Sequence, residues 1–351
     1  MTEVVLTGAG LTTRLGDGAE AFWRRLRDGD CTLAPQPTEP LVLDRTELAA
    51  LRARMLTRVA REALAQARLD GADGGGRWLV VVAAQADDGA TPALDPPALR
   101  EAPRIVVSHA CASAGFGLAL GRAWLHSGRA DRVLLLSACV QTDHELKGMA
   151  VARTLSPAHA RPFDPQRDGT VVGEGAGALV LERGADAARR GAAPLAALAG
   201  IACRVGGGSR AGIDERVARR CVEAALADAG KLRIGYVHAH ATGTVAGDDA
   251  ELALLAALPG AGALPVSSHK GCVGHLMHCS MVSGVVAAIG ALRERTLPGT
   301  LGLSAPRTHG RVRLLRDAEP CPGLEGALVN GFGFGDNNAA LVLARAADER
   351  T

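Results

Sequence analysis

Cys111 lies in the segment that best fits nucleophilic chemistry. The apolar residues 105–107 precede it, and the small residues 112–115 follow it. This pattern predicts a strand that ends before Cys111 and a helix that begins after it. A thiol at a helix N-terminus lies near free backbone N–H groups, which stabilise a thiolate and can hold an oxyanion. A buried core cysteine fits the same spacing equally well, so both interpretations stay open at this point.

Two further segments combine histidines with other polar residues just after predicted strands. They are residues 238–251, with His238, His240, Thr242, Thr244, Asp248 and Glu251, and residues 268–275, with His269, Lys270 and His275. A histidine at a strand end can polarise a thioester carbonyl or transfer a proton, and a nearby lysine supplies charge. One such histidine alone is more often a hydrogen-bonded core residue. Two such segments together with a strand-end cysteine favour acyl chemistry.

Zinc binding is a competing interpretation of overlapping residues. The possible ligands are Cys272, His275, His278 and Cys279, together with His238 and His240. The first four have a spacing compatible with ligands on one helix. The glycine-rich turns and Lys270 fit acyl chemistry better, so zinc is the minor alternative.

The composition is that of an ordinary globular protein. The chain has 351 residues, 48% hydrophobic and 22% charged, with a net charge of +2. Aromatic residues make up only 3%, so we expect a core of alanine, leucine and valine. The small net charge gives no sign of nucleic-acid binding, and no signal peptide or membrane-spanning run is visible. We therefore expect a cytoplasmic protein whose eight cysteines are mostly free thiols.

The elements that must position these residues alternate along the chain. Strands are expected at 4–6, 78–83, 104–108, 133–137, 176–181, 236–239 and 266–268, with a closing hairpin from 328–330 to 340–343. Helices are expected at 47–69, 112–127, 215–229 and 275–293, and a loop at 84–103. This alternation predicts α/β layers with covered sheets. A stretch rich in arginine, glycine and alanine at 183–194 marks a junction between two halves.

In their order along the chain, the motifs resemble the β-ketoacyl synthase family. The matching segments are 110–113, 162–177, 240–251, 270–275 and 330–335. The chain is short for the family, so we identify it as a short, divergent member of the thiolase superfamily. The resemblance implies a five-layer αβαβα sandwich built from two similar halves. We expect residues 1–185 to carry the nucleophile and residues 186–351 the His/Lys site.

The resemblance also implies a role for each site residue. Cys111 would accept the acyl chain, and His240 and His275 would hold the thioester oxygen of a malonyl-type extender. Lys270 would support that site electrostatically. The backbone N–H groups of Cys111 and Phe334 would hold the oxyanion, and Phe334 would also gate the acyl pocket. The remaining supporting residues would be Asp248, Glu251, Thr242 and Thr244. No metal or organic cofactor is implied.

The implied activity is a decarboxylative condensation of acyl- and malonyl-thioesters on an acyl carrier protein. A homodimer, or a heterodimer with a ketosynthase-like subunit, is implied as well. Two alternatives keep the same residues. One is an acyltransferase that passes the acyl group from Cys111 to an amine or hydroxyl. The other is a non-catalytic, chain-length-factor-like partner of another ketosynthase. Arg24, Arg25 and Arg27, or the helix around residues 52–61, are candidates for docking an acidic carrier.

Several positions depart from the family pattern. Ala241 stands where a glycine is usual, Gly331 where a serine is usual, and Thr170 where a phenylalanine is usual. Residues 276–281 are bulkier than the small residues expected there, and the loop at 84–103 replaces a longer segment. These changes leave Cys111 and both histidines intact but alter the substrate environment. They favour polyketide or other specialised metabolism over housekeeping fatty-acid synthesis.

Overall fold

The computed structural model describes residues 3–36, 41–71, 75–86, 89–90, 92–95, 97–207, 212–260, 262–306 and 308–346. Up to residue 189 the strands are β1 (Val4–Thr13), β2 (Gly16–Asp17), β3 (Trp78–Ala83), β4 (Arg104–Val107), β5 (Arg132–Cys139) and β6 (Gly175–Arg183). The helices there are α1 (Ala19–Asp28), α2 (Arg45–Gln66), α3 (Pro97–Arg100), α4 (Ser113–His126), α5 (Asp143–Val151) and α6 (Gly184–Arg189).

The later strands are β7 (Ala196–Val205), β8 (Ile234–His238), β9 (Leu264–Ser267), β10 (Thr296–Leu297), β11 (Thr308–His309), β12 (Val312–Leu314), β13 (Glu319–Pro320), β14 (Gly326–Gly333) and β15 (Asn337–Ala344). The later helices are α7 (Glu215–Asp228), α8 (Val245–Ala256), α9 (Lys270–Val273), the 3-10 turn η2 (Met277–Cys279) and α10 (Ser280–Glu294). No helix within these described ranges is long and apolar enough to cross a membrane.

Two groups of five strands repeat one topology. The first lies in the order β4-β3-β5-β6-β1 and the second in the order β9-β8-β14-β15-β7. In each group the first three strands run parallel, and the last two pairings are antiparallel. The groups join where β1 pairs briefly with β7. This repeat supports two similar halves, while the boundary predicted at residue 185, inside α6, stays a prediction.

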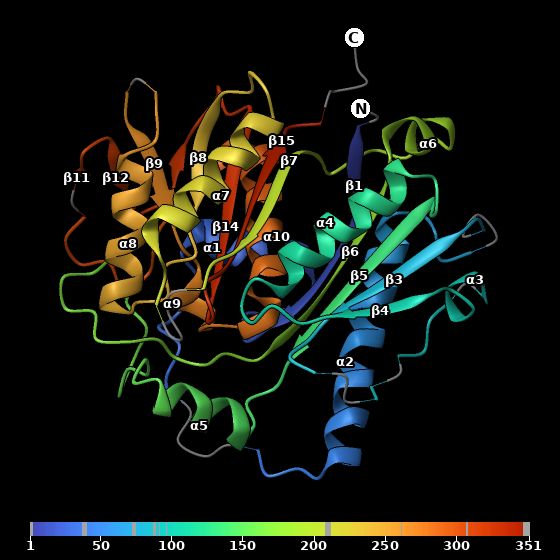
Figure 1. Ribbon diagram of the computed structural model, residues 1–351, viewed down its shortest axis with the longest axis horizontal. Helices are drawn as coiled ribbons and strands as arrows, with labels where there is room; N and C mark the ends of the chain where they lie inside the picture. The colour runs from blue at the N-terminus through green and yellow to red at the C-terminus, as the bar shows by residue number, and fades with distance from the viewer. Residues whose placement is uncertain are drawn as a thin grey trace.

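Helices separate and cover the two strand groups in five layers. Helices α4 and α10 contact strands of both groups and each other, and form the central layer (Figure 1). Helix α2 contacts β1, β5 and β6 on one outer face, while α7 contacts β7 and β15 on the other. The α-β-α-β-α succession is the layering expected from the sequence.

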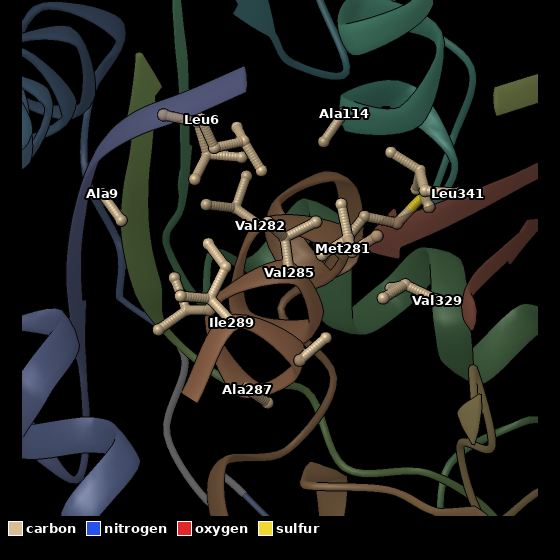
Figure 2. Packing of buried hydrophobic residues seen from close by; sticks show 14 of the residues in the cluster. Leu6, Ala9, Ala114, Met281, Val282, Val285, Ala287, Ile289, Val329 and Leu341 are labelled. Carbon is tan, nitrogen blue, oxygen red and sulfur yellow. The ribbon is translucent and has the colours of Figure 1, made fainter. Parts of the chain in front are cut away.

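The core is built from small and aliphatic side chains, as the low aromatic content predicts. Helix α10 is buried on all sides from Ser280 to Leu292. Figure 2 shows Val282, Val285 and Ile289 of this helix packed among residues of β1 and β14. A helix that is apolar all round must be enclosed by other elements, which is the position that a central layer provides.

The expected strands and helices are present with shifted ends, and one helix begins five residues later than expected. The helix expected at 275–293 begins only at Ser280. Met277 has φ +48° and Gly274 has φ +74°, so the backbone between them leaves the helical path. His275 pairs instead with Val172 in an isolated β-bridge. The loop at 84–103 holds the short helix α3, and residues 87–88, 91 and 96 lie outside the described ranges.

The cysteine prediction needs one correction. Six of the eight cysteines are free thiols, as expected, but Cys31 and Cys272 form a disulfide. Cys31 follows α1 and Cys272 lies in α9, and their Cα atoms are 5.9 Å apart. The pairing was not visible in the sequence because 241 positions separate the two residues.

Candidate active site

Cys111 projects from a sharp turn between β4 and α4. Ala110, the residue before it, has φ +48°, a left-handed conformation that costs energy for a residue with a side chain. The Ser113 hydroxyl stabilises the turn by accepting from the His109 N–H at 2.8 Å and donating to the Ala110 carbonyl at 2.6 Å. Cys111 is only 5% exposed, so the turn presents its thiol to an enclosed site.

His275 is the direct partner of the thiol. Its Nε2 lies 2.9 Å from the Cys111 sulfur, and its Nδ1 lies 2.8 Å from the Ser280 hydroxyl. The backbone also fixes this residue, because the His275 N–H donates to the Val171 carbonyl at 2.6 Å and the Gly173 N–H donates to the His275 carbonyl. The cysteine of one strand group is thus paired with a histidine that precedes the central helix α10.

The glycine-rich tail brings a second backbone donor to the sulfur. The backbone N–H groups of Cys111 and Phe334 lie near the Cys111 sulfur, where both act to lower the pKa of the thiol. Gly333 permits this approach, since a Cβ there would lie 2.8 Å from the Cys111 nitrogen and 3.0 Å from the Ala110 Cβ. Asn337 holds the loop by donating to the Phe334 carbonyl at 2.7 Å. These are the two N–H groups that the sequence analysis assigned to an oxyanion hole, and that role stays a prediction.

His240 faces the same site from the other histidine segment. Its ring centroid is 5.3 Å from that of His275, with the planes 86° apart. Glu251 accepts from the backbone N–H groups of His240 and Ala241 at 2.9 and 2.7 Å. The Lys270 ammonium donates to the His240 carbonyl. Glu251 and Lys270 therefore hold the His240 loop by its backbone.

Asp248 supports the following turn in the same manner. It accepts from the N–H groups of Phe163 at 2.7 Å and Gly243 at 3.1 Å. Burial raises the pKa of Asp248 to about 7, and burial also raises the pKa of Glu251. Both carboxyl groups lie outside the cavity wall and accept from backbone donors, and their supporting role stays a prediction.

Burial is the largest cause of the pKa shifts of Cys111, His240, His275 and Lys270. It raises the pKa of the Cys111 thiol to about 11, opposed by the charge of Lys270 and by the two backbone donors. Burial, with the charge of Lys270, holds the pKa values of His240 and His275 well below the usual range. Burial lowers the pKa of Lys270 to about 8, opposed by Glu251. The imidazoles are neutral at pH 7, so each can donate one N–H and accept one proton.

A cavity of about 330 Å³ opens onto these groups. Its wall includes Cys111, His240, His275, Thr242, Thr244 and Phe334. Phe334 is partly exposed and packs against a small apolar cluster that includes Leu146 and Met149. Lys270, Asp248 and Glu251 do not line the cavity. The structure thus brings together every predicted site residue, six in the wall and three behind it.

The zinc interpretation is not supported by the geometry of the proposed ligands. Cys272 is in the disulfide with Cys31, and the ring of His275 is hydrogen-bonded to the Cys111 sulfur. The His278 Nε2 donates to the Ala138 carbonyl at 2.8 Å, and the Cys279 thiol donates to a backbone carbonyl. Within the described part of the chain, no group of three or more His, Cys, Asp or Glu residues is arranged to hold a metal ion.

A buried chain of hydrogen bonds behind the site was not anticipated. Its members, all at most 1% exposed, are Ser267, Tyr236, His238, His269 and Ser283. The Tyr236 hydroxyl lies 2.7 Å from the Ser267 hydroxyl and 2.8 Å from His238 Nδ1. His238 Nε2 lies 2.6 Å from His269 Nδ1, and His269 Nε2 lies 2.8 Å from the Ser283 hydroxyl.

The direction of every bond in this chain follows from its end. The Ser283 hydroxyl donates to the Ser280 carbonyl, so it must accept from His269 Nε2–H. His269 Nδ1 then accepts from His238, whose Nδ1 in turn accepts from Tyr236. The chain is complete only with both imidazoles neutral, and burial lowers the pKa of His238 to about 3 and that of His269 well below its usual value.

This buried chain of hydrogen bonds links the segments that carry His240, Lys270 and His275. His238 precedes His240 by two residues, and His269 directly precedes Lys270. Ser283 lies on α10 one turn after Ser280, the partner of His275. The sequence did signal two of its members, since His238 and His269 stand at strand ends, but Tyr236 and Ser283 carried no pattern of their own.

Two departures from the family pattern compensate each other. A Cβ at Gly331 would lie 2.1 Å from the Met281 sulfur, and one at Gly115 would lie 2.8 Å from it. Met281 is 1% exposed and fills the space between β14 and α4 (Figure 2). The Met281 side chain therefore occupies the space that a side chain at position 331 would need.

Comparisons with known proteins bear on the family. The profile described as "Beta-ketoacyl synthase, N-terminal domain" matches residues 100–187, and the one described as "Beta-ketoacyl synthase, C-terminal domain" matches residues 195–304. Together they cover more than half of the chain. The 3-oxoacyl-(acyl-carrier-protein) synthase 2 of Rhizobium meliloti (strain 1021) is 36% identical over 216 residues, which are 57% of this chain and 50% of that protein.

A second relative is a component of the pikromycin polyketide synthase of Streptomyces venezuelae. It is 34% identical over 272 residues, which are 70% of this chain and 7% of that protein. The chain thus spans half or less of the length of these curated relatives. A solved structure described as "The ishigamide ketosynthase/chain length factor" has a TM-score of 0.85 at 23% identity, covering 99% of this chain and 100% of that one.

The structural likeness confirms the thiolase-like αβαβα fold predicted from the sequence. The two profiles confirm the family that the order of the motifs indicated. The chain belongs to the beta-ketoacyl synthase family.

Proposed function

We propose that the protein is a ketosynthase, which joins an acyl thioester to a malonyl-type extender by decarboxylative Claisen condensation. One observation carries the proposal. The Cys111 sulfur lies 2.9 Å from His275 Nε2 and near the backbone N–H groups of Cys111 and Phe334, in a cavity that His240 also lines. A nucleophile, a base and an oxyanion hole are the groups that acyl transfer needs.

The first half-reaction loads Cys111. The sulfur attacks the donor's carbonyl carbon while the thiol proton passes to His275 Nε2, a neutral acceptor at hydrogen-bond distance. The N–H groups of Cys111 and Phe334 hold the oxyanion. The carbon–sulfur bond to the donor then breaks, and the donor thiol leaves with the proton from His275.

The second half-reaction forms the carbon–carbon bond. Before this step the proton of neutral His275 exchanges from Nδ1 to Nε2, so that Nδ1 accepts from the Ser280 hydroxyl. His240 and His275 then each donate an N–H to the thioester oxygen of the extender, which stabilises the enolate formed as carbon dioxide leaves. The enolate carbon attacks the acyl carbonyl, and the Cys111 sulfur departs as a thiolate that takes up a proton from solvent. Lys270 lies behind His240, where its charge favours the developing negative charge.

Substrates and partners are part of the same proposal. The relatives named 3-oxoacyl-(acyl-carrier-protein) synthase and polyketide synthase support an acyl carrier protein as the donor's carrier. The altered residues at 170, 281 and 331 and the polyketide relative favour specialised metabolism. A dimer is proposed from the structural neighbour. Among the predicted docking arginines, Arg27 pairs with Asp28 and Glu294 and is partly exposed, while Arg58 pairs with Asp17 and is exposed.

The test is product analysis with acyl-thioester and malonyl-carrier protein. We expect a β-ketoacyl carrier, detected by intact mass, together with carbon dioxide release. An amide or ester formed instead from acyl-Cys111 would make the acyltransferase alternative correct. Inactivity of the purified chain, with activity only beside a copurified homologue whose own cysteine is essential, would make it the non-catalytic partner.

A further inference from the structure

Thr170 stands out in the wall of the active-site cavity. It is fully buried, and its hydroxyl has no hydrogen-bond partner among the described residues. Among the described residues, His240 is the only other cavity-lining side chain with such an atom, at Nδ1, and it belongs to the proposed catalytic residues. Leaving a buried hydroxyl unpaired is unfavourable, so the position calls for a functional explanation.

The local structure fixes Thr170 in this position. Its N–H donates to the Thr154 carbonyl at 2.7 Å, and its carbonyl accepts from the Ser156 N–H at 2.7 Å. Both backbone groups are therefore occupied, and the hydroxyl is the one polar atom of this cavity-lining residue without a partner among the described residues. The position also follows Gly169, which packs against the turn at Gly243 beside His240.

The neighbouring cavity hydroxyls are satisfied within the protein. The Thr154 hydroxyl donates to the Met149 carbonyl at 3.0 Å. The hydroxyls of Thr242 and Thr244 bond each other at 3.0 Å. The unpaired hydroxyl of Thr170 is thus a property of one position and not of a generally polar wall.

We propose that Thr170 selects an acyl chain that carries an oxygen near its thioester end, as a hydroxyl or keto group. The inference rests on the proposed function, because it assumes that Cys111 is loaded with an acyl chain. The oxygen would accept the Thr170 O–H, which an unsubstituted alkyl chain cannot do. Thr170 and Cys111 line the same cavity of about 330 Å³, so the oxygen belongs within a few carbons of the thioester.

The experiment compares the loading of Cys111 by matched donors. Wild type and Thr170→Val are incubated with N-acetylcysteamine thioesters of hexanoate, 3-hydroxyhexanoate and 5-hydroxyhexanoate, and acylation rates are measured by intact mass. Valine has the shape of threonine without the hydroxyl. One hydrogen bond of about 1 kcal/mol predicts a roughly fivefold fall in the preference for a hydroxylated donor over hexanoate.

Two control variants frame the comparison. Thr170→Ser keeps the hydroxyl and should keep the preference. Thr154→Val removes a hydroxyl that the protein already satisfies and should leave the preference unchanged. An unchanged preference in Thr170→Val, or an equal loss for all three donors, would overturn the inference while the proposed function stands. Absence of any adduct on wild type would overturn the proposed function and the inference together.

Discussion

Gly331 and Met281 offer a quantitative test of the packing argument. If the methionine occupies the space of a missing side chain, restoring the family's serine at 331 must be harmful while Met281 is present. The added Cβ would lie 2.1 Å from the sulfur and 2.4 Å from the Cγ of Met281. Gly115 and Ala339 border the same space, so the methionine has little room to move. Overpacking of this kind costs about 1–3 kcal/mol.

The second single variant removes the obstacle instead. Met281→Ala deletes a side chain that is 1% exposed, and such truncations cost about 2–5 kcal/mol. In that background, Gly331→Ser meets no methionine and partly refills the space. We therefore expect the serine to cost less than about 1 kcal/mol there, which gives a coupling free energy of about 1–3 kcal/mol between the two positions.

Urea unfolding of wild type, both single variants and the double variant measures this cycle. We predict that the double variant loses clearly less free energy of unfolding than the two single variants lose in sum. Free energies that add within about 0.5 kcal/mol would refute the reasoning, since they would show that the two positions do not share one space. Gly148→Ser is a useful control, because a Cβ there meets no atom within 4 Å.

Four further predictions concern the buried hydrogen-bond chain and the oxyanion hole. Tyr236→Phe leaves His238 Nδ1 and the Ser267 hydroxyl unpaired, so the free energy of unfolding should fall by about 2 kcal/mol or more; an unchanged value would contradict the chain. Burial raises the pKa of Tyr236, the only tyrosine, so its phenolate absorbance should appear well above pH 10 in the folded protein and near pH 10 in urea. Burial lowers the pKa of His238 to about 3 in the folded protein, whereas the unfolded chain binds this proton with a pKa of about 6.5. The neutral His238 therefore favours the folded state fully above about pH 6.5, and the free energy of unfolding decreases as the pH falls below that value. His238→Gln should therefore reduce the loss of stability between pH 7.5 and 5.5 by about 1 kcal/mol, and an undiminished loss would show that His238 is protonated in the fold. Gly333→Ala should slow the loading of Cys111 about a hundredfold by displacing the Phe334 N–H, whereas a normal rate would remove that N–H from the mechanism.

Local patterns in the sequence were sufficient for the main architecture. The strand before Cys111, the helix after it and the closing hairpin each have a periodicity or turn signal within about twenty residues. The order of the motifs then indicated how the two halves meet. The nine predicted site residues lie at or behind one cavity because most of them stand in or beside turns at the ends of strands and helices that the layers bring together.

The features that were missed depend on contacts between distant segments. The late start of α10 follows from the bridge between Val172 and His275, and neither residue shows it locally. The disulfide joins Cys31 to Cys272 across 241 positions. The link from Tyr236 to Ser283 likewise exists only after β8 has packed against α10. Periodicity describes which face of an element is buried, but not which polar atom it will meet there.

Loading of Cys111 tests the central claim most directly. Intact-protein mass spectrometry after incubation with a panel of acyl-thioesters would be run on wild type, Cys111→Ala and, as a matched control, Cys139→Ala, which removes another buried free thiol. The account predicts one acyl adduct on wild type and on Cys139→Ala, and none on Cys111→Ala. An adduct that survives in Cys111→Ala, or no adduct on wild type with any donor, would contradict it.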